Sequence, residues 1–367
     1  MKITPIVLAF PVFLLAIAAE AFHAHRRRSH TYNLADALTS IHFGCLSEVE
    51  RTLARLLVTA IYAAVYAQFH AFELSATDWR VWVGALLAYD FCYYWVHRFG
   101  HQVNLVWASH QVHHSSEYFN LSTALRQTAT GSLLKWPFYL GLAVVGVPPV
   151  VFATVALIDL LYQVWVHTEQ VGRLGWLDRV FVTPSNHRVH HGQNDYCIDR
   201  NFGGILILWD RLFGTYAEER TVEPVVYGVR KPFHSLNPVW GNLVHYRDLW
   251  RASRTAPDWR SALAVWFGPP EGWNQQVPAM SFAGFRRYEP LVYGGNRVAV
   301  LLQSALLIGL TFHYILMAVS LDWPLRLLEG ALILAGSVLV SRQLEGRWQF
   351  FGRSSPDLPA TSTEGGR

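Results

Sequence analysis

The sequence predicts an all-α protein, a polytopic bundle of membrane helices. Charged residues make up 15% of the 367 residues and hydrophobic residues 52%, whereas about 25% of an ordinary soluble protein is charged. Mean hydropathy is positive. Several apolar runs approach the roughly 20 residues that an α-helix needs to cross a bilayer. Together these observations favour membrane helices over one or two soluble domains.

The first apolar run covers residues 3–19, "ITPIVLAFPVFLLAIAA". Lys2 precedes it, as in a signal peptide, but the run is long for one and the basic segment "HAHRRR" (23–28) follows it. We therefore expect a retained membrane anchor. Because positively charged segments remain in the cytoplasm, the N-terminus is predicted to face outwards.

Four further runs predict two hairpins. Residues 53–72 and 79–96 are joined by a short link and predict an α-hairpin that brings residue 97 to the cytoplasmic side. Residues 133–147 and 150–166 are shorter, and Pro148 and Pro149 join them. This second pair is predicted to be a hairpin whether or not it crosses the membrane fully, and it returns the chain to the cytoplasmic side at His167.

The rest of the chain predicts one more pair of spans. Residues 167–297 contain many arginines and no run long enough to cross a bilayer, which predicts a cytoplasmic region resting partly on the membrane. Within it, residues 203–216 are expected to be interfacial or core. Runs 298–320 and 323–340 predict the last hairpin, and the tail from residue 353 is expected to be disordered. The links predicted to lie outside contain no Lys or Arg, in agreement with the positive-inside rule.

Nine of the 17 histidines gather where this topology brings the chain to the cytoplasmic face. They lie in "HRFGH" (His97, His101), in "HQVHH" (His110, His113, His114), at His167, and in "HRVHH" (His187, His190, His191). Residues i, i+3 and i+4 share one face of a helix, so each HxxHH triplet is predicted to present its imidazoles together. At this histidine frequency a triplet should begin by chance at roughly one position in ten thousand, so two copies are a strong signal.

The nine histidines predict a histidine-rich di-metal site on the cytoplasmic face. Neutral imidazoles bind Zn, Cu, Fe and Ni. A tetrahedral zinc site takes four protein ligands at most, so eight or nine histidines are too many for one ion and about right for two. A zinc peptidase needs a glutamate between its histidines; here Glu117 and Glu169 lie only outside the boxes. Redox iron is therefore favoured, although the spacing alone leaves the metal open.

Other residues near the boxes are predicted to have supporting roles or none. A metal-bound histidine usually donates its second N–H to a partner. The candidates are Asp90, Asn186, Asn194 and Asp199, each also explained as a cap or surface group. The other eight histidines are expected to be ordinary hydrogen-bonded residues: His23, His25, His30, His42, His70, His234, His245 and His313. The three cysteines form no CxxC pair, and the net charge of +4 requires no nucleic-acid partner.

The order HxxxH, HxxHH and HxxHH among membrane spans resembles the fatty acid hydroxylase and sterol desaturase superfamily. Two segments resemble its alkylglycerol monooxygenase branch, including bacterial relatives: "WASHQVHHSSEYFNLSTALRQ" (107–127) and "WVHTEQVGRLGWLDRVFVTPSNHRVHHGQNDYCIDRNFGGILILWDRLFGTY" (165–216). The resemblance implies a non-haem di-iron, O2-dependent oxidoreductase acting on a lipid, in which the nine histidines are both metal ligands and catalytic residues for two Fe. Gln163 and His167 fall where other members carry a further HxxxH, which supports His167 as the ninth ligand.

The resemblance also bears on the source of electrons, which we expect to be an external donor. In the alkylglycerol monooxygenase branch a reduced pterin supplies electrons, and hydroxylation of the ether-linked carbon gives a hemiacetal that collapses. That branch typically has Glu after its first box, whereas this chain has Gln102. Gln102 is therefore the candidate cofactor-binding position, and pterin use and ether cleavage stay open.

These inferences divide the chain into five predicted regions. They are the N-terminal membrane spans (1–78), a fatty acid hydroxylase-like catalytic region (79–235), a cytoplasmic or interfacial region (236–297), a C-terminal membrane hairpin (298–341) and a disordered tail (342–367). A lipid tail is expected to enter between helices that carry aromatic residues, namely Phe91, Tyr93, Tyr94, Trp95 and Trp165. Thr123, Arg126 and Gln127 are candidates for facing its head group, although helix packing explains them as well.

Two alternatives remain open for the function. A desaturase or hydroxylase of a sterol, carotenoid or fatty acyl chain uses the same metal site. A non-catalytic membrane metal-binding or transport protein is disfavoured, because transporters place polar ligands near the middle of the membrane. Here the histidines are predicted to lie at span ends and in loops.

Overall fold

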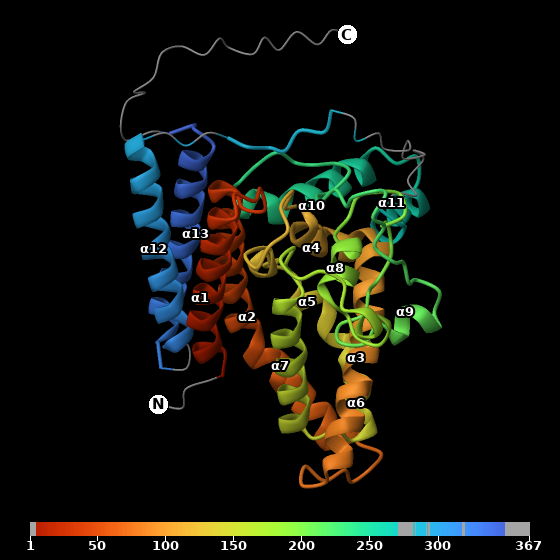
Figure 1. The fold of residues 1–367 in the computed structure, drawn as a ribbon. Helices are drawn as coiled ribbons and strands as arrows, with labels where there is room; N and C mark the ends of the chain where they lie inside the picture. The colour runs from red at the N-terminus through yellow and green to blue at the C-terminus, as the bar shows by residue number, and fades with distance from the viewer. Residues whose placement is uncertain are drawn as a thin grey trace.

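Long apolar helices from the two ends of the chain pack side by side (Figure 1). The computed structural model describes residues 5–270, 282, 284–290, 292, 294–317 and 320–348, and the regular elements in these ranges are helices, with two isolated β-bridges. Four helices are long and apolar enough to cross a membrane: α1 (Pro5–Arg26), α2 (Leu34–Phe69), α12 (Gly294–Leu316) and α13 (Trp323–Leu344). The predicted all-α membrane bundle is thus confirmed, while the predicted tail from 353 lies outside the described residues.

Helix α2 is much longer than the predicted run 53–72. It begins at Leu34, where the Asn33 side chain accepts hydrogen bonds from the backbone N–H groups of Ala35 and Asp36. Polar residues in its first half lower the hydropathy there, so no apolar run marks this part of the helix. Several of these polar residues are nonetheless buried, including Thr39, His42 and Glu48. The helix packs against both α12 and α13.

The central hairpins form a second group of helices. They are α3 (Trp79–Gln102), α5 (Ser132–Lys135), the 3-10 turn η2 (Trp136–Tyr139), α6 (Leu140–Val145) and α7 (Pro149–Trp165). Helix α3 is not among the four helices that qualify as spans by composition, since it carries Arg80, Asp90 and Arg98 along with its histidines. The predicted run 133–147 is divided into three short pieces, so this hairpin is short, as expected.

A layer of shorter elements lies at one end of the long helices. It comprises α4 (Asn104–His114), η1 (Thr123–Leu125), η3 (Gly175–Arg179), α8 (Pro184–His190), α9 (Leu208–Leu212), α10 (Pro238–Arg254) and α11 (Trp259–Phe267). In Figure 1, α10 and α11 run across the upper ends of the long helices, with α4 and α8 beneath them. Helix α10 packs on α4, α2 and α13. The ends of α3 and α7 enter this layer, so the histidine boxes meet there.

Candidate metal centre

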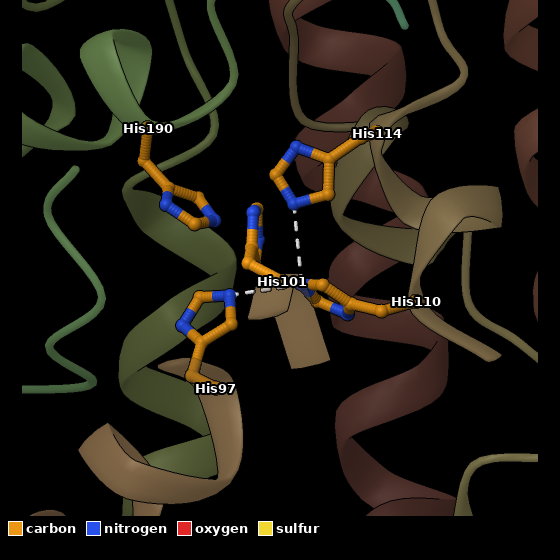
Figure 2. A group of neighbouring side chains, drawn as sticks. All are labelled: His97, His101, His110, His114 and His190. Carbon is orange, nitrogen blue, oxygen red and sulfur yellow. Dashed lines mark hydrogen bonds between the residues drawn. The ribbon is translucent and has the colours of Figure 1, made fainter. Parts of the chain in front are cut away.

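The nine predicted histidines converge into two buried groups. The groups are His97, His101, His110, His114 and His190, and His113, His167, His187 and His191. Within each group, one nitrogen of every ring lies within 4.8 Å of the corresponding nitrogen of the others. Figure 2 shows the five-histidine group, whose rings come from α3, α4 and α8 and point toward a common centre.

Each HxxHH triplet is divided between the two groups, which the sequence pattern did not indicate. His110 and His114 lie one helical turn apart and enter the five-histidine group, whereas His113 enters the four-histidine group. The second triplet divides in the opposite sense, with His190 in the five-histidine group. The face that carries each triplet therefore lies between the two groups and contributes histidines to both.

Backbone carbonyl groups determine which nitrogen carries the proton in four of the histidine rings. The Nδ1 atoms of His97, His190 and His167 lie 2.8, 2.8 and 2.7 Å from the carbonyl oxygens of Phe202, Arg200 and Gln163. His113 Nδ1 lies 3.1 Å from the Arg126 carbonyl oxygen. Because a carbonyl oxygen only accepts hydrogen bonds, each of these Nδ1 atoms carries the proton. In a neutral imidazole the Nε2 atom then has a free lone pair.

These free lone pairs face each other in the interior. The Nε2 atoms of His113 and His167 are 3.3 Å apart, and neither carries a proton in the neutral ring, so the contact is not a hydrogen bond. His190 Nε2 and His101 Nε2 are buried with no hydrogen-bond partner in the described part of the chain. Metal–nitrogen bonds of about 2.1 Å place neighbouring ligand atoms about 3.0–3.4 Å apart. The nitrogens therefore fit a shared cation in each group.

Burial keeps the imidazoles in the form that a metal binds. Loss of solvation, reinforced by the neighbouring rings, holds the pKa of the histidines on α4 and in the segment 187–191 well below the usual value. Burial lowers the pKa of His167 to about 4, against the opposing effect of its hydrogen bond to the Gln163 carbonyl. These rings are thus neutral at physiological pH, and neutral imidazole is the metal-binding species.

Two buried carboxylates hold the carbonyl groups that orient the rings, and the sequence did not single out either. Asp210 accepts hydrogen bonds from the backbone N–H groups of Phe202 and Gly203, both at 2.7 Å. Asp36 forms a buried ion pair of 2.5 Å with Arg126. Each carboxylate therefore acts on an imidazole indirectly, Asp210 through the carbonyl oxygen of Phe202 and Asp36 through that of Arg126.

Of the four residues predicted to be hydrogen-bond partners of the nine histidines, only Asp199 lies near one of them. Asp199 Oδ1 lies 3.6 Å from His101 Nδ1. Asp90 accepts hydrogen bonds from the backbone N–H groups of Ile205 and Leu206. Asn186 and Asn194 bond backbone groups of neighbouring loops.

Gln163 lies at the position where the resemblance implies a further histidine. Its side chain does not bond a histidine ring. Its Nε2 donates to Asp159 at 2.5 Å, and its Oε1 accepts from the Tyr93 hydroxyl at 2.6 Å. Its carbonyl oxygen accepts from His167. The glutamine therefore connects α3 with α7 and orients the ninth histidine.

The remaining candidates mostly serve packing. Tyr94 is fully buried and stacks on Phe213, whereas Phe91 and Trp165 lie partly exposed on the outer surface. Arg126 is bound by Asp36 and does not face the metal groups through its guanidinium. Outside the nine, His42 bonds Ser304 and His70 bonds Glu73.

A cavity of about 1170 Å³ opens beside the five-histidine group. His101, His114 and His190 line it, and so does Gln102. Residues of α10 and α11, such as Trp240 and Val265, line it too. The predicted cofactor-binding position thus lies in a cavity that reaches three of the clustered histidines.

This region is similar to a family of known proteins. Residues 82–215 match the fatty acid hydroxylase family. The chain is 44% identical to an alkylglycerol monooxygenase from Danio rerio over 247 residues. This similarity covers 67% of this chain and 54% of that protein. It is 42% identical over 250 residues to the alkylglycerol monooxygenase of Homo sapiens (68% of this chain, 55% of that protein).

A more distant relative is also a lipid hydroxylase by name. The chain is 30% identical over 145 residues to an ornithine lipid hydroxylase from Rhizobium tropici, covering 37% of this chain and 41% of that protein. The chain spans about half the length of the alkylglycerol monooxygenases that it matches. No solved structure matches it.

Proposed function

We propose that this protein is a membrane-bound, O2-dependent monooxygenase that hydroxylates a C–H bond of a lipid, because residues 82–215 match the fatty acid hydroxylase family. The single observation that carries the proposal is the pair of histidine groups inside this region. Unprotonated nitrogens face each other within a group, as those of His113 and His167 do. The names of the relatives, alkylglycerol monooxygenase and ornithine lipid hydroxylase, support a lipid as the substrate.

We infer that each group holds one iron ion, with nine histidines as the ligands. Five nitrogens would hold one ion and four the other. Iron in such a site supplies the activation of O2 and the oxidation of an unactivated C–H bond. Zinc hydrolysis has less support, because no glutamate lies between the histidines of the boxes.

The protein's own contribution is position and exclusion of water. The carbonyl oxygens of Phe202, Arg200 and Arg126 fix the ring orientations of His97, His190 and His113, which second-sphere contacts do in many metalloproteins. Phe119 stacks on His167 and packs on His191, and Phe202 packs on the five-histidine group. These rings are buried and keep solvent from the nitrogens.

We place the site on the cytoplasmic side of the membrane. The ends of α3 and α7 that deliver His97 and His167 lie at the same end of the bundle as the C-terminus of α1 (Figure 1). That C-terminus leads into Arg26, Arg27 and Arg28. Clusters of Arg remain in the cytoplasm by the positive-inside rule.

The electron donor in this proposal is external to the described chain. A reduced pterin is one candidate, and Gln102 is the residue to examine, since it lines the cavity beside the five-histidine group. Cleavage of an ether lipid would follow if the hydroxylated carbon bears the ether oxygen. Desaturation of the same lipid class is the alternative outcome.

The test is a lipid analysis of membranes with and without the protein, repeated for His190→Ala and for the control His42→Ala. His42 is a buried histidine outside both groups, bonded to Ser304. We expect a lipid that is consumed with the wild type and with His42→Ala, and retained with His190→Ala. An aldehyde product indicates ether cleavage, a stable alcohol indicates hydroxylation and a new double bond indicates desaturation. Full conversion by His190→Ala refutes the proposal.

A further inference from the structure

Two short elements, η3 and α9, expose large apolar side chains beside each other. The elements are neighbours because the Ile207 N–H group donates a hydrogen bond of 3.1 Å to the Val180 carbonyl oxygen. Four exposed residues at these elements make up what we call the flank patch: Leu174, Trp176, Leu208 and Leu212. The exposure of Trp176 is 68% and that of Leu212 is 69%. Exposed apolar patches of this kind mark contacts with other proteins or with membranes.

The inner side of the flank patch is held firmly by the protein. Ile207 is buried in an apolar cluster with Val166 and Val182. The hydroxyl group of Tyr162, near the end of α7, donates a hydrogen bond of 2.8 Å to the Val182 carbonyl oxygen. The segment 203–216 was expected to be interfacial or core, and its inner side is core. Its outer side is therefore a fixed apolar surface and not a loose loop.

The flank patch adjoins an exposed apolar side of α3. Residues four positions apart share one side of a helix, and exposed apolar residues recur on α3 at this spacing, namely Trp79, Val83, Leu87 and Phe91. Phe91 packs on Trp209 and Phe213, with ring centroids 5.2 and 6.3 Å apart. Figure 1 shows α9 beside α3 on the flank of the bundle, lower than α10 and α11. The patch therefore continues a helix surface that is suited to lipid.

The edge of the flank patch is positively charged. Arg173, Arg179 and Arg211 are exposed there. Among these three, Arg173 alone has a carboxylate within 4 Å in the described part of the chain, and that carboxylate belongs to the exposed Glu218. Asp210 is buried and accepts a hydrogen bond from the protein itself. Apolar side chains with arginines around them are typical of elements that lie in the head-group region of a membrane, where tryptophan is also frequent.

We propose that the flank patch is seated in the membrane leaflet nearest the histidine groups and binds anionic phospholipid there. Its leucines and Trp176 lie at the boundary between head groups and acyl chains, and Arg179 and Arg211 bind lipid phosphate groups. A second copy of the chain fits this surface less well, because a two-fold interface would bring the arginines of two identical patches together. The inference goes beyond the proposed function and does not depend on it.

The experiment places a nitrobenzoxadiazole fluorophore on one introduced cysteine of the full chain in nanodiscs. The labelled variants are Leu212→Cys and Trp176→Cys, two exposed positions at which the label displaces no buried side chain. They are made in a Cys92→Ala background, because the other two native cysteines are buried. Val83→Cys on α3 is the reference for lipid, and Val222→Cys, at 91% exposure, is the reference for water. The quenchers are nitroxide-labelled phosphatidylcholine, nitroxide-labelled phosphatidylglycerol and aqueous iodide.

We expect the labels at positions 212 and 176 to be quenched by nitroxide lipid, as at Val83, and to be shielded from iodide compared with Val222. At equal lipid content, phosphatidylglycerol should quench them more than phosphatidylcholine does. Adding Arg179→Gln should lower the ratio of the two quenching constants by up to about fivefold, which corresponds to about 1 kcal/mol for one arginine at a membrane surface. Arg254→Gln is the matched control, since Arg254 is exposed at the end of α10 and should leave the ratio unchanged.

Three results would overturn the inference. The first is quenching of both patch labels by iodide to the extent seen at Val222. The second is shielding of both labels from lipid and iodide alike, which means that protein, such as a second copy of the chain, covers the patch. The third is equal quenching by the two phospholipids, which removes the role of the arginines. The labels report their surroundings without turnover, so each result is separate from the test of lipid oxidation.

Discussion

Replacing Asp36 by Asn and replacing Asp210 by Asn should weaken the binding of different metal ions, because each carboxylate supports a different group of histidines. Asp36 pairs with Arg126, whose carbonyl oxygen orients His113 in the four-histidine group. Asp210 holds the backbone of Phe202 and Gly203, and the Phe202 carbonyl oxygen orients His97 in the five-histidine group. Neither carboxylate belongs to either group.

The expected costs follow from the contacts that each variant loses. Asp36→Asn leaves a guanidinium with a side-chain exposure of 3% without its counter-charge, which costs roughly 3–5 kcal/mol of unfolding free energy. Asp210→Asn turns one acceptor oxygen into a donor facing a backbone N–H or the Thr215 hydroxyl, at a cost of about 1–3 kcal/mol. Loss of such second-sphere support typically lowers metal affinity about 10–100-fold.

The assay is retention of 57Fe against a competing chelator, followed by metal analysis and by the Mössbauer signals of the two ions. We expect Asp36→Asn to release one ion first and Asp210→Asn to release the other. Asp195→Asn is the matched control, since Asp195 has 59% side-chain exposure and only a surface pair with Arg230, worth at most about 1 kcal/mol. If Asp36→Asn and Asp210→Asn release the same ion, or both ions in parallel, this reasoning is refuted.

Three further outcomes test the packing around the site. Gly204→Ala should lower the unfolding temperature by several degrees, because its Cβ would lie 2.6 Å from Asp159 Oδ1, whereas Gly84→Ala, with nothing within 4 Å, should not. Arg188→Met should cost roughly 3 kcal/mol in thermal or denaturant unfolding, because the guanidinium binds both oxygens of Glu219, at 2.7 and 2.8 Å; a change under about 0.5 kcal/mol would contradict this. Burial raises the pKa of Glu219, but hydrogen bonds from Arg188 and Ser185 together with the positive charges of Arg188 and Arg173 outweigh it and lower the pKa overall. The stability from this pair is therefore present above the ordinary value of about 4.3 and is lost as pH falls below it. The difference between wild type and Arg188→Met should therefore shrink in acid, and a constant difference from pH 7 to pH 3 would speak against the pair.

Hydropathy predicted the helices that face lipid and missed the helical segment that faces protein. The run 298–320 corresponds to α12, which ends at Leu316, and 323–340 to α13, which ends at Leu344. The first half of α2 escaped prediction because its polar residues, such as His42, are buried against the C-terminal hairpin. A window that averages hydropathy along the chain does not detect burial that comes from distant segments.

Histidine spacing predicted which nine rings converge, but not how they divide. Positions i and i+4 point alike on a helix, so His110 with His114 and His187 with His191 were recoverable as pairs from helix geometry. The assignment of His113 and His190 to opposite groups depends on how distant segments of the chain pack together, which no local pattern encodes. The supporting atoms are backbone carbonyls, which every residue has, so their roles carry no sequence signal.

The most direct test of the central claim is the metal content of the purified full chain with its Mössbauer spectrum. The two histidine groups predict two irons per chain in the wild type and about one in His113→Ala, since that histidine belongs to the four-histidine group alone. The same sample should consume O2 in a lipid-dependent manner only with both irons present. One ion per chain in the wild type, or two tightly held zinc ions in a protein that consumes no O2 after iron loading, would contradict the account.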